Sequence, residues 1–399
     1  MGFIMRRRAT LAAAAAWLIA SGPAGIAPRA WACPLCGPPG MTLAEQVARR
    51  DCVLLMRWVS TQEPEDELDS GKTTFEYVAR FKGTPEQKPG YRLTIDRMVK
   101  SKPGSLYLLN GSFDDAGKLQ WGFPLAVSQA TWDFITQAPV EDATTHEKIR
   151  YYAKFLEHSD PLVAGDAFVS FAAIEPGDIA ACPEAFSREK LRSWLDNPET
   201  PIVRRSFYAM LLGLVGNDDD AAYLEKSLFD PPSEAAAGAR RYGLEGLVVG
   251  LVLQRGANGF DAIDRLIESA PPIADSDAAA VAIGLRYLWT YGGDRVPRER
   301  LRLSMRKLLA YPRVAETAIT DLARWKDWSV QKRLRELFET PDYNVRGTRQ
   351  AIVQYMHACL RDAPAQGETP PHVADAKRYL AEMRALDAKL VEFVEKTLP

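Results

Sequence analysis

The stretch Thr200-Pro201-Ile202-Val203-Arg204 has the form of a helix start, with a capping residue directly before a proline. Proline suits the first turn of a helix because the N–H that it lacks would have no partner there. A related stretch, DPLV at 160–163, lies 40 residues earlier. DYNVR at 342–346 is a third instance, DWSV at 327–330 is a partial one, and Thr340-Pro341 repeats the cap. These stretches predict a series of similar helix starts.

Proline and glycine residues divide the chain after residue 128 into segments of roughly 10–20 residues with apolar positions at helical spacing. No strand is predicted in this part. Short helices in such a series form antiparallel pairs, and each pair must stack on its neighbours to bury its apolar side. The 40-residue interval lies within the period of HEAT repeats. Residues 128–399 are therefore predicted to form an all-α, HEAT-like helical solenoid.

Short β-prone segments separated by turn residues fill the chain before residue 128. They are 52–59, 73–81, 91–98, 106–109 and 118–127. A short helix precedes them, opened by a capping box at Thr42 and Glu45. So many short strands in so short a stretch indicate a small barrel or sandwich. The chain is thus predicted to be an α+β multidomain protein, with a small β-barrel domain at 33–127.

The first 32 residues have the parts of a secretory signal peptide. Three arginines, at 6–8, precede an almost wholly apolar run from Ala9 to Ala20, and Ala30-Trp31-Ala32 has the small-residue form of a cleavage site. The apolar run is too short to span a bilayer, which takes about 20 helical residues. The mature protein is therefore predicted to be secreted or periplasmic and to begin near Cys33. A lipid anchor at Cys33 is an alternative that the bulky Trp31 fits poorly.

Charge and hydropathy bear on the partners of the chain. Its formal net charge is −2, and removal of the signal peptide leaves 46 basic against 52 acidic residues. A mildly acidic protein has no general attraction for nucleic acid, so no nucleic-acid partner is predicted. The apolar run 242–253 contains Glu245 and three glycines, and it is too short for a membrane span. It is predicted to be a buried helix of the solenoid.

Five cysteines are present: Cys33, Cys36, Cys52, Cys182 and Cys359. In an oxidising compartment some should pair, and a disulfide between Cys33 and Cys36, or from one of them to Cys52, would fix the N-terminus to the β domain. Cys359, in an apolar helical pattern, is predicted to be a buried thiol. The alternative is a thiol-based redox or metal-handling site at Cys33 and Cys36. A zinc site needs about four ligands, and a second Cys-x-x-Cys pair is absent from the sequence.

No catalytic, cofactor or metal motif stands out, and the four histidines do not cluster in the sequence. The chain is predicted not to be an enzyme and to use no cofactor. One surface is a candidate for binding: Trp325 and Trp328 beside Arg324 and Lys326, where aromatic rings would stack on a ligand. The alternative interpretation places both tryptophans in the core with the basic side chains reaching to solvent.

The mature sequence resembles a group of uncharacterised bacterial exported proteins in which a Cys-Pro-x-Cys motif and a small β domain precede HEAT-like repeats. The likeness rests on CPLC at 33–36, TLAEQ at 42–46, DCVLL at 51–55, the segment 75–83, LWTYG at 288–292 and DLARWKDWSVQ at 321–331. The resemblance implies an architecture and an exported location, and it implies no particular activity.

The β domain is also similar to netrin-like domains, which have an OB-type barrel. The likeness covers 33–127 and includes YVARFKG at 77–83. Metalloprotease inhibitors of this class chelate a protease zinc through an N-terminal cysteine, a position that Cys33 would hold after cleavage. The sequence departs from that class in its Cys-x-x-Cys spacing and in lacking the later barrel cysteines.

The function expected from the sequence is that of an exported, non-enzymatic scaffold whose helical repeats bind another exported protein. The first alternative is thiol-based redox or metal handling through Cys33 and Cys36. The second is a β domain that acts as a metalloprotease inhibitor.

Overall fold

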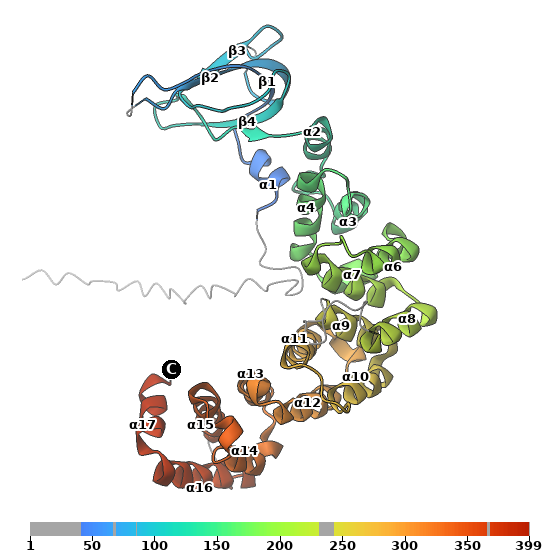
Figure 1. Ribbon diagram of the computed structural model, residues 1–399, viewed down its shortest axis with the longest axis vertical. Coiled ribbons are helices and arrows are strands. Elements are labelled where there is room, and N and C mark those ends of the chain that lie inside the picture. Colours follow the sequence, from blue (N-terminus) through green and yellow to red (C-terminus); the bar gives the residue numbers. More distant parts are fainter. Residues whose placement is uncertain (1–40, 67–68, 85, 231–242, 365–367, 399) are drawn as a thin grey trace, which may run out of the picture.

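A computed structural model describes residues 41–66, 69–84, 86–230, 243–364 and 368–398 (Figure 1). The predicted signal peptide at 1–32 and the cysteines at 33 and 36 lie outside the described residues. The described chain begins with a short helix, continues as a curled antiparallel sheet, and ends as a long arc of helices. Strands precede residue 128 and helices follow it, in agreement with the predicted α+β order.

Helix α1 (Leu43–Ala48) joins the two parts. Its capping box is formed as predicted, with Thr42 and Glu45 bonding each other's backbone N–H groups. The Leu43 N–H donates to Asp166 Oδ1 on α4 (Pro161–Ser170) at 2.5 Å. This contact ties the chain just before the sheet to the helical part, because the two residues are 123 positions apart.

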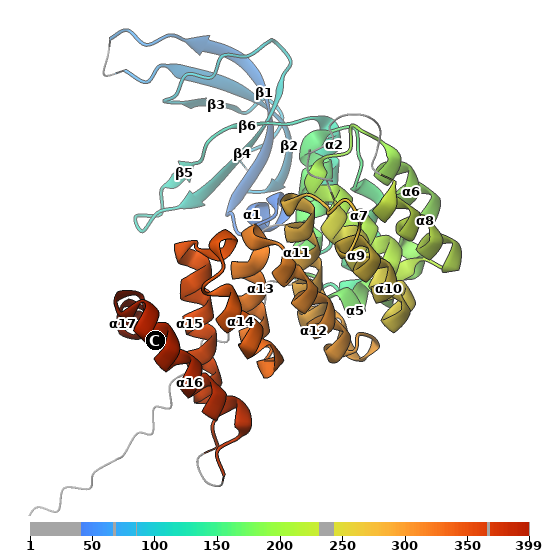
Figure 2. The ribbon, with the colours of Figure 1, turned by 60° about the horizontal axis from the view of Figure 1, so that its bottom comes forward.

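The sheet consists of β1 (Cys52–Gln62), β2 (Lys72–Lys82), β3 (Arg92–Ile95), β4 (Leu106–Phe113), β5 (Leu119–Trp121) and β6 (Leu125–Ala126). The strand order is β3-β2-β1-β4-β5, and β6 also pairs with β4. The sheet curls into a half-barrel, with β3 and β5 on opposite sides of its opening (Figure 2).

The predicted barrel is thus open in the described part of the chain, because the path of paired strands ends at β3 and at β5. Both edge strands are shorter than the sequence predicted. Segment 118–127 is split into β5 and β6 around Pro124, which has no N–H to give to the ladder. Short edges leave too little backbone to close the barrel by hydrogen bonds.

Strand β1 is buried on both faces where it begins, which explains its continuous apolar run. Val53 and Leu55 join the core shared with the helices. Cys52, Leu54 and Met56 face the inside of the curl. The sheet therefore packs against the helical part through one face and forms a separate small core with the other.

The helical part opens with α2 (Gln129–Thr136), α3 (Thr145–Tyr152), α4 (Pro161–Ser170) and α5 (Pro176–Ala180). An outer layer follows: α6 (Arg188–Asp196), α8 (Asp218–Phe229), α10 (Gly259–Ile267), α12 (Arg298–Lys307), α14 (Gln331–Leu337) and α16 (Pro371–Leu386). The inner layer is α7 (Ile202–Val215), α9 (Leu244–Arg255), α11 (Asp275–Tyr291), α13 (Pro312–Arg324), α15 (Arg346–Arg361) and α17 (Ala388–Thr397).

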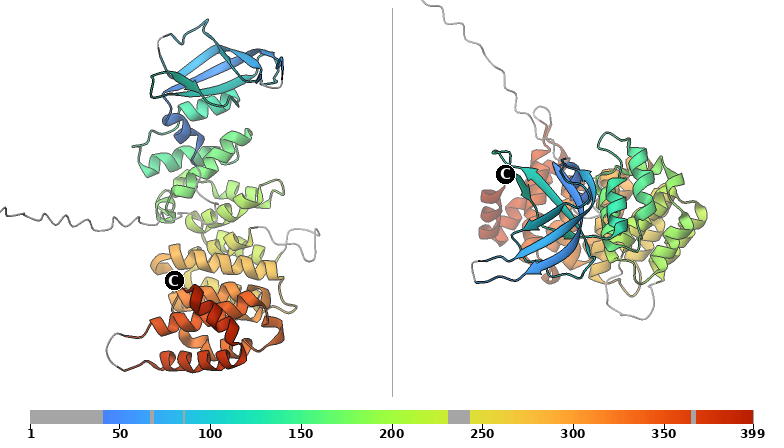
Figure 3. Two further views of the ribbon diagram at one scale, coloured as in Figure 1. Left: turned by 90° about the vertical axis from the view of Figure 1, so that its left-hand side faces the viewer. Right: turned by 90° about the horizontal axis from the view of Figure 1, so that it is seen from above.

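Within the inner layer each helix packs on the next, from α7 to α17, and this layer lines the concave side of the arc (Figure 1). The helices stack as successive tiers beneath the sheet, as Figure 3 shows. The recurring helix starts in the sequence predict such a repeat-like helical region. Asp160 caps α4 and Pro161 opens it, as predicted. Thr340 holds the N-cap position of a short 3₁₀ turn (Pro341–Tyr343) opened by Pro341, although its side chain makes no capping hydrogen bond. At α7 the N-cap is Pro201, so the capping prediction for Thr200 is wrong.

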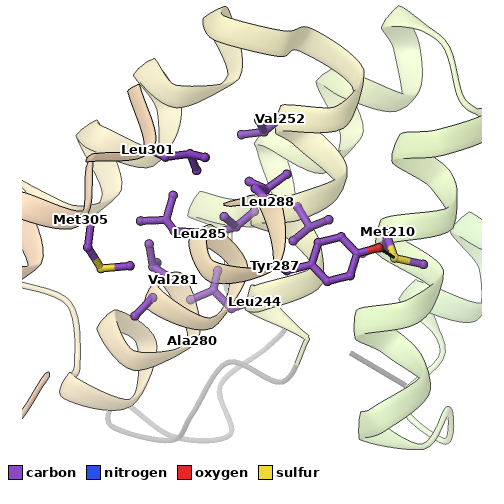
Figure 4. Close-up of a cluster of buried hydrophobic side chains, with 14 of the residues drawn as sticks. Met210, Leu244, Val252, Ala280, Val281, Leu285, Tyr287, Leu288, Leu301 and Met305 are labelled. Atoms are coloured by element: carbon purple, nitrogen blue, oxygen red, sulfur yellow. Dashed lines mark hydrogen bonds between the residues drawn. The ribbon is translucent and has the colours of Figure 1, made fainter. Parts of the chain in front are cut away.

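The core between the layers is apolar and continuous. Figure 4 shows its centre, where side chains of α7, α9, α11 and α12 meet. The Tyr287 hydroxyl is buried there and lies 2.9 Å from the sulfur of Met210. Burial raises the pKa of Tyr287 far above its usual range.

The glycines of α9 serve close packing against α7. A Cβ on Gly250 would lie 2.3 Å from the Ala209 carbonyl oxygen, and one on Gly246 would lie 2.1 Å from that of Ser206. A Cβ on Gly213 of α7 would clash with the backbone of Gly250 in the same way. The small residues thus let α7 and α9 approach at backbone distance, and α9 is a buried helix as predicted. In the described residues, no helix combines the length and the apolar character that a bilayer span requires.

Candidate functional site

The four residues predicted as a stacking surface lie where α13 ends and the chain turns toward α14. Trp325 is only 3% exposed, and Trp328 is half-buried. Arg324 and Lys326 are exposed. The aromatic rings therefore belong mainly to the core, and the basic groups reach the surface. This arrangement agrees with the alternative interpretation, in which the tryptophans are core residues and do not stack on a ligand.

Asp362, at the end of α15, holds two of these residues. Lys326 Nζ lies 2.7 Å from one carboxylate oxygen, and Trp328 Nε1 donates to the other at 2.7 Å. The hydrogen bonds from Lys326 and Trp328 keep the pKa of Asp362 below its usual range. Lys326 has a φ of +54°, which lies in the left-handed region that residues other than glycine rarely adopt. The contact with Asp362 thus fixes a strained helix end, which is a structural role.

Trp325 stacks on Trp289 from the end of α11. The ring centroids are 4.4 Å apart and the planes differ by 8°. The Arg298 guanidinium lies 4.4 Å from the Trp289 ring and covers its outer side. This stack joins the ends of α11 and α13, and the arginine lies where a ligand would have to stack. The sequence could not reveal it, because the two tryptophans are 36 residues apart.

The described cysteines are free, buried thiols: Cys52, Cys182 and Cys359. Cys52 Sγ lies 3.2 Å from Gln87 Oε1, and no disulfide from Cys52 is seen. Burial raises the pKa of the Cys52 and Cys182 thiols above the usual range. It raises the pKa of Cys359 to about 12. The buried thiol predicted at Cys359 is confirmed. In the described ranges, no three His, Cys, Asp or Glu side chains group as metal ligands would.

Successive inner helices run in the same direction, so their first turns lie along one edge of the array. We call the first turns of α11, α13, α15 and α17 the N-terminal rim. A hollow of about 560 Å³ in this rim is lined by Asp275 of α11, Arg313 and Glu316 of α13, and Val345 and Thr348 at the start of α15. Three helix starts that are far apart in the sequence therefore share one surface.

A second hollow of about 470 Å³ lies on the other side of the start of α15. Its lining includes Arg346 and Arg349 from α15 and Lys389, Leu390 and Phe393 from α17. Phe393 is 44% exposed, and the Arg346 guanidinium lies 4.8 Å from its ring. An exposed aromatic ring beside basic groups is a feature that binding surfaces share.

Two of the basic groups in this second hollow have no acidic partner in the part of the chain that the structure describes. Arg349 is paired, since its Nη1 lies 3.0 Å from Asp387 Oδ2. Among the described residues, no carboxylate lies within 4.0 Å of the charged groups of Arg346 or Lys389. The second hollow therefore combines an apolar floor with two unneutralised positive charges.

Two arginines elsewhere in the array, Arg286 and Arg306, are neutralised by buried carboxylates. Arg286 forms a bidentate pair with Asp321, and Arg306 forms one with Asp327. The first pair joins α11 to α13, the second joins α12 to the turn after α13, and both carboxylates are buried. These arginines are structural, which sets Arg346 and Lys389 apart from them.

No pattern in the sequence indicates the second hollow. In the sequence Arg346 belongs only to a predicted helix start, and Lys389 and Phe393 follow it by more than 40 residues. Helix α17 brings them together by folding back on α15. An exposed phenylalanine next to a lysine near the C-terminus is too common a pattern to indicate a site by itself.

Comparison of the chain with protein-family models, with curated proteins and with solved structures finds no match.

Proposed function

We propose that this chain is an exported, non-enzymatic scaffold whose HEAT-like helical solenoid binds another exported protein through the N-terminal rim. The observation that carries the proposal is the second hollow, where unpaired Arg346 and Lys389 flank the exposed ring of Phe393. The two stacked layers of helices support the solenoid part, because such arrays present long binding surfaces built from successive helices.

The chemistry of the hollow indicates the kind of segment that it binds. The apolar floor of Leu390 and Phe393 suits one apolar or aromatic side chain of the partner. Arg346 and Lys389 suit carboxylates beside that side chain, and they favour an acidic partner by electrostatic attraction. An apolar residue flanked by Asp or Glu on the partner fits both features.

The test captures partners from the exported fraction of the native cell by mild crosslinking to the mature protein. The wild-type chain should recover one specific protein, and Lys389→Glu should reduce that recovery at least tenfold. Lys332→Glu is the matched control, since Lys332 is an exposed lysine of α14 in the outer layer. It makes the same change of charge away from the rim and should leave recovery unchanged.

Phe393→Ala separates the apolar part of the contact from the charge. It should also weaken recovery, and circular dichroism should show that the variant is folded, because nearly half of the ring is exposed. Equal recovery by wild type, Lys389→Glu and Phe393→Ala would contradict binding at this rim. Equal losses in Lys389→Glu and Lys332→Glu would show attraction by net charge alone.

The export part of the proposal is based on the signal-peptide pattern of residues 1–32. Intact mass of the protein from the native cell should show a chain that begins near Cys33. A chain that begins at Met1 would contradict export with cleavage, and added mass of acyl chains on Cys33 would show the lipid-anchored alternative.

A further inference from the structure

The two hollows of the N-terminal rim carry opposite charge. The lining of the first hollow contains three carboxylates and one arginine. The lining of the second contains three basic side chains and one carboxylate, the same numbers with the signs reversed. The hollows lie on either side of the start of α15, so the rim is negative toward α13 and positive toward α17.

The negative charge of the first hollow is only partly neutralised within the chain. Arg313 Nε lies 3.6 Å from Asp275 Oδ2. Among the described residues, no basic group lies within 4.0 Å of the carboxylates of Glu316 or Asp342. Glu316 lies against the start of α15, since a Cβ on Gly347 would be 2.1 Å from Glu316 Oε2. Asp342 is exposed on the turn directly before α15, where a second protein can reach it.

Exposed apolar side chains accompany both charges. Val345, the residue before α15, is 55% exposed and lines the first hollow together with Asp342. Phe393 is 44% exposed and lines the second hollow together with Lys389. Val345 with Asp342 beside it is an apolar residue next to a carboxylate, which is the feature that suits the second hollow.

A rim of this kind is complementary to itself. When two copies face each other across a two-fold axis at the start of α15, the α13 side of one rim meets the α17 side of the other. Each negative hollow then faces a positive one, and the contact occurs twice. The net negative charge of the chain opposes this only weakly, because physiological salt limits interactions between exposed charges to about 8 Å.

We propose that the N-terminal rim, when no other protein occupies it, binds a second copy of this chain as a symmetric dimer. In the dimer Asp342 and Val345 of each copy lie against Lys389 and Phe393 of the other. The inference rests on the proposed function, because it assigns an occupant to the same rim. Another exported protein that binds there displaces the second copy.

Sedimentation velocity of the purified mature chain over a range of concentrations tests the dimer. The wild type should reach a dimer and no larger species, and the dimer should weaken as salt is raised. Lys389→Glu and Asp342→Lys should each weaken the dimer at least tenfold, because each places like charges together at both contacts.

The matched controls make the same charge changes away from the rim. Lys332→Glu changes an exposed lysine of α14 in the outer layer. Asp142→Lys changes an exposed aspartate in the loop between α2 and α3. Both controls should dimerise like the wild type.

An equimolar mixture of Lys389→Glu and Asp342→Lys tests the pairing itself. In the mixed dimer a glutamate at 389 faces a lysine at 342, and the wild-type Lys389 of the second copy faces the wild-type Asp342 of the first. Opposite charges thus meet at both contacts, and the mixture should dimerise at least tenfold more tightly than either variant alone.

A wild type that stays monomeric would overturn the inference, as would a dimer that both charge reversals leave intact or a mixture that restores nothing. Larger, open-ended species would contradict the two-fold arrangement. A monomeric chain that still recovers another protein through Lys389 would overturn the dimer and leave the proposed function standing. A dimer with the expected variant behaviour that recovers no other protein would do the reverse.

Discussion

Cys52, Cys182 and Cys359 combine burial with raised pKa values, and this makes them unreactive at neutral pH. The thiolate is the nucleophile, and burial raises the pKa of Cys359 to about 12. The native mature protein is treated with iodoacetamide at pH 7.5, about 1 pH unit below the pKa of an ordinary thiol. This treatment should leave all three cysteines unmodified. All three should react in denaturant.

Mass spectrometry of tryptic peptides gives the result for each cysteine. Fast native labelling of Cys182 or Cys359 would contradict the burial described for them. The same digest reports on the cysteines at 33 and 36, so it also tests the thiol-based alternative. If that pair proves permanently oxidised and inert to mild reductant, the redox alternative fails.

His357 on α15 gives the molecule a pH dependence. Burial lowers the pKa of His357, and the nearby Arg361 and Arg384 act in the same direction while Glu395 opposes them. The unfolded chain therefore binds this proton more readily than the folded chain. Stability should fall as pH drops below the ordinary histidine value, about 6.5, through the lowered native pKa.

His357→Gln should remove this part of the acid destabilisation, as measured by urea unfolding at a series of pH values between neutral and mildly acidic. His146→Gln is the control, because His146 is exposed on α3. It should leave the pH profile as it is. A profile of His357→Gln that matches the wild type would show that the imidazole is not the cause.

The helices α7 and α9 depend on glycine at their contact. Gly250→Ala places a Cβ against the Ala209 carbonyl and should lower the free energy of unfolding by about 1–3 kcal/mol. Gly165→Ala on α4 is the same substitution in open space. It should raise the free energy of unfolding by about 0.4–1 kcal/mol, since alanine has the better helix propensity. Urea unfolding measures both, and equal signs would contradict the packing described.

The attachment of α1 depends on Asp166. Burial raises the pKa of Asp166, and its carboxylate accepts the Leu43 N–H. Asp166→Asn keeps an acceptor and removes the cost of a buried charge, so thermal unfolding at neutral pH should show stability equal to or above that of the wild type. Asp166→Ala should lose about 1 kcal/mol. A stability loss of equal size in both variants would mean that the charge itself is required.

Elements with local signals could be predicted from the sequence, and contacts between distant residues could not. The capping box at Thr42 and the helix start at Asp160 are set by residues within four positions, so both predictions are confirmed. Thr200 has the same local pattern, but its hydroxyl is buried without a partner among the described residues. There the packing of α7 overrides the capping preference.

The candidate site illustrates the same limit at the scale of the whole molecule. The sequence indicated Trp325 and Trp328 because aromatic and basic residues alternate there, but Trp289 and Asp362 from other helices occupy them. The second hollow needs α15 and α17 side by side. The return of α17 onto α15 is what brings Arg346 to Lys389 and Phe393.

The start of α15 offers the most direct test of binding at the N-terminal rim. This helix has no side-chain cap, so the first N–H groups, from Arg346 to Thr348, lack an intrahelical partner and should exchange quickly with solvent. Hydrogen exchange of the mature protein is measured with and without the partner recovered by crosslinking. We predict slower exchange at 345–349 and 388–393 when the partner is bound, and unchanged exchange at 324–328. Slowing confined to 324–328 or to the sheet, with the rim unchanged, would contradict the proposed scaffold surface.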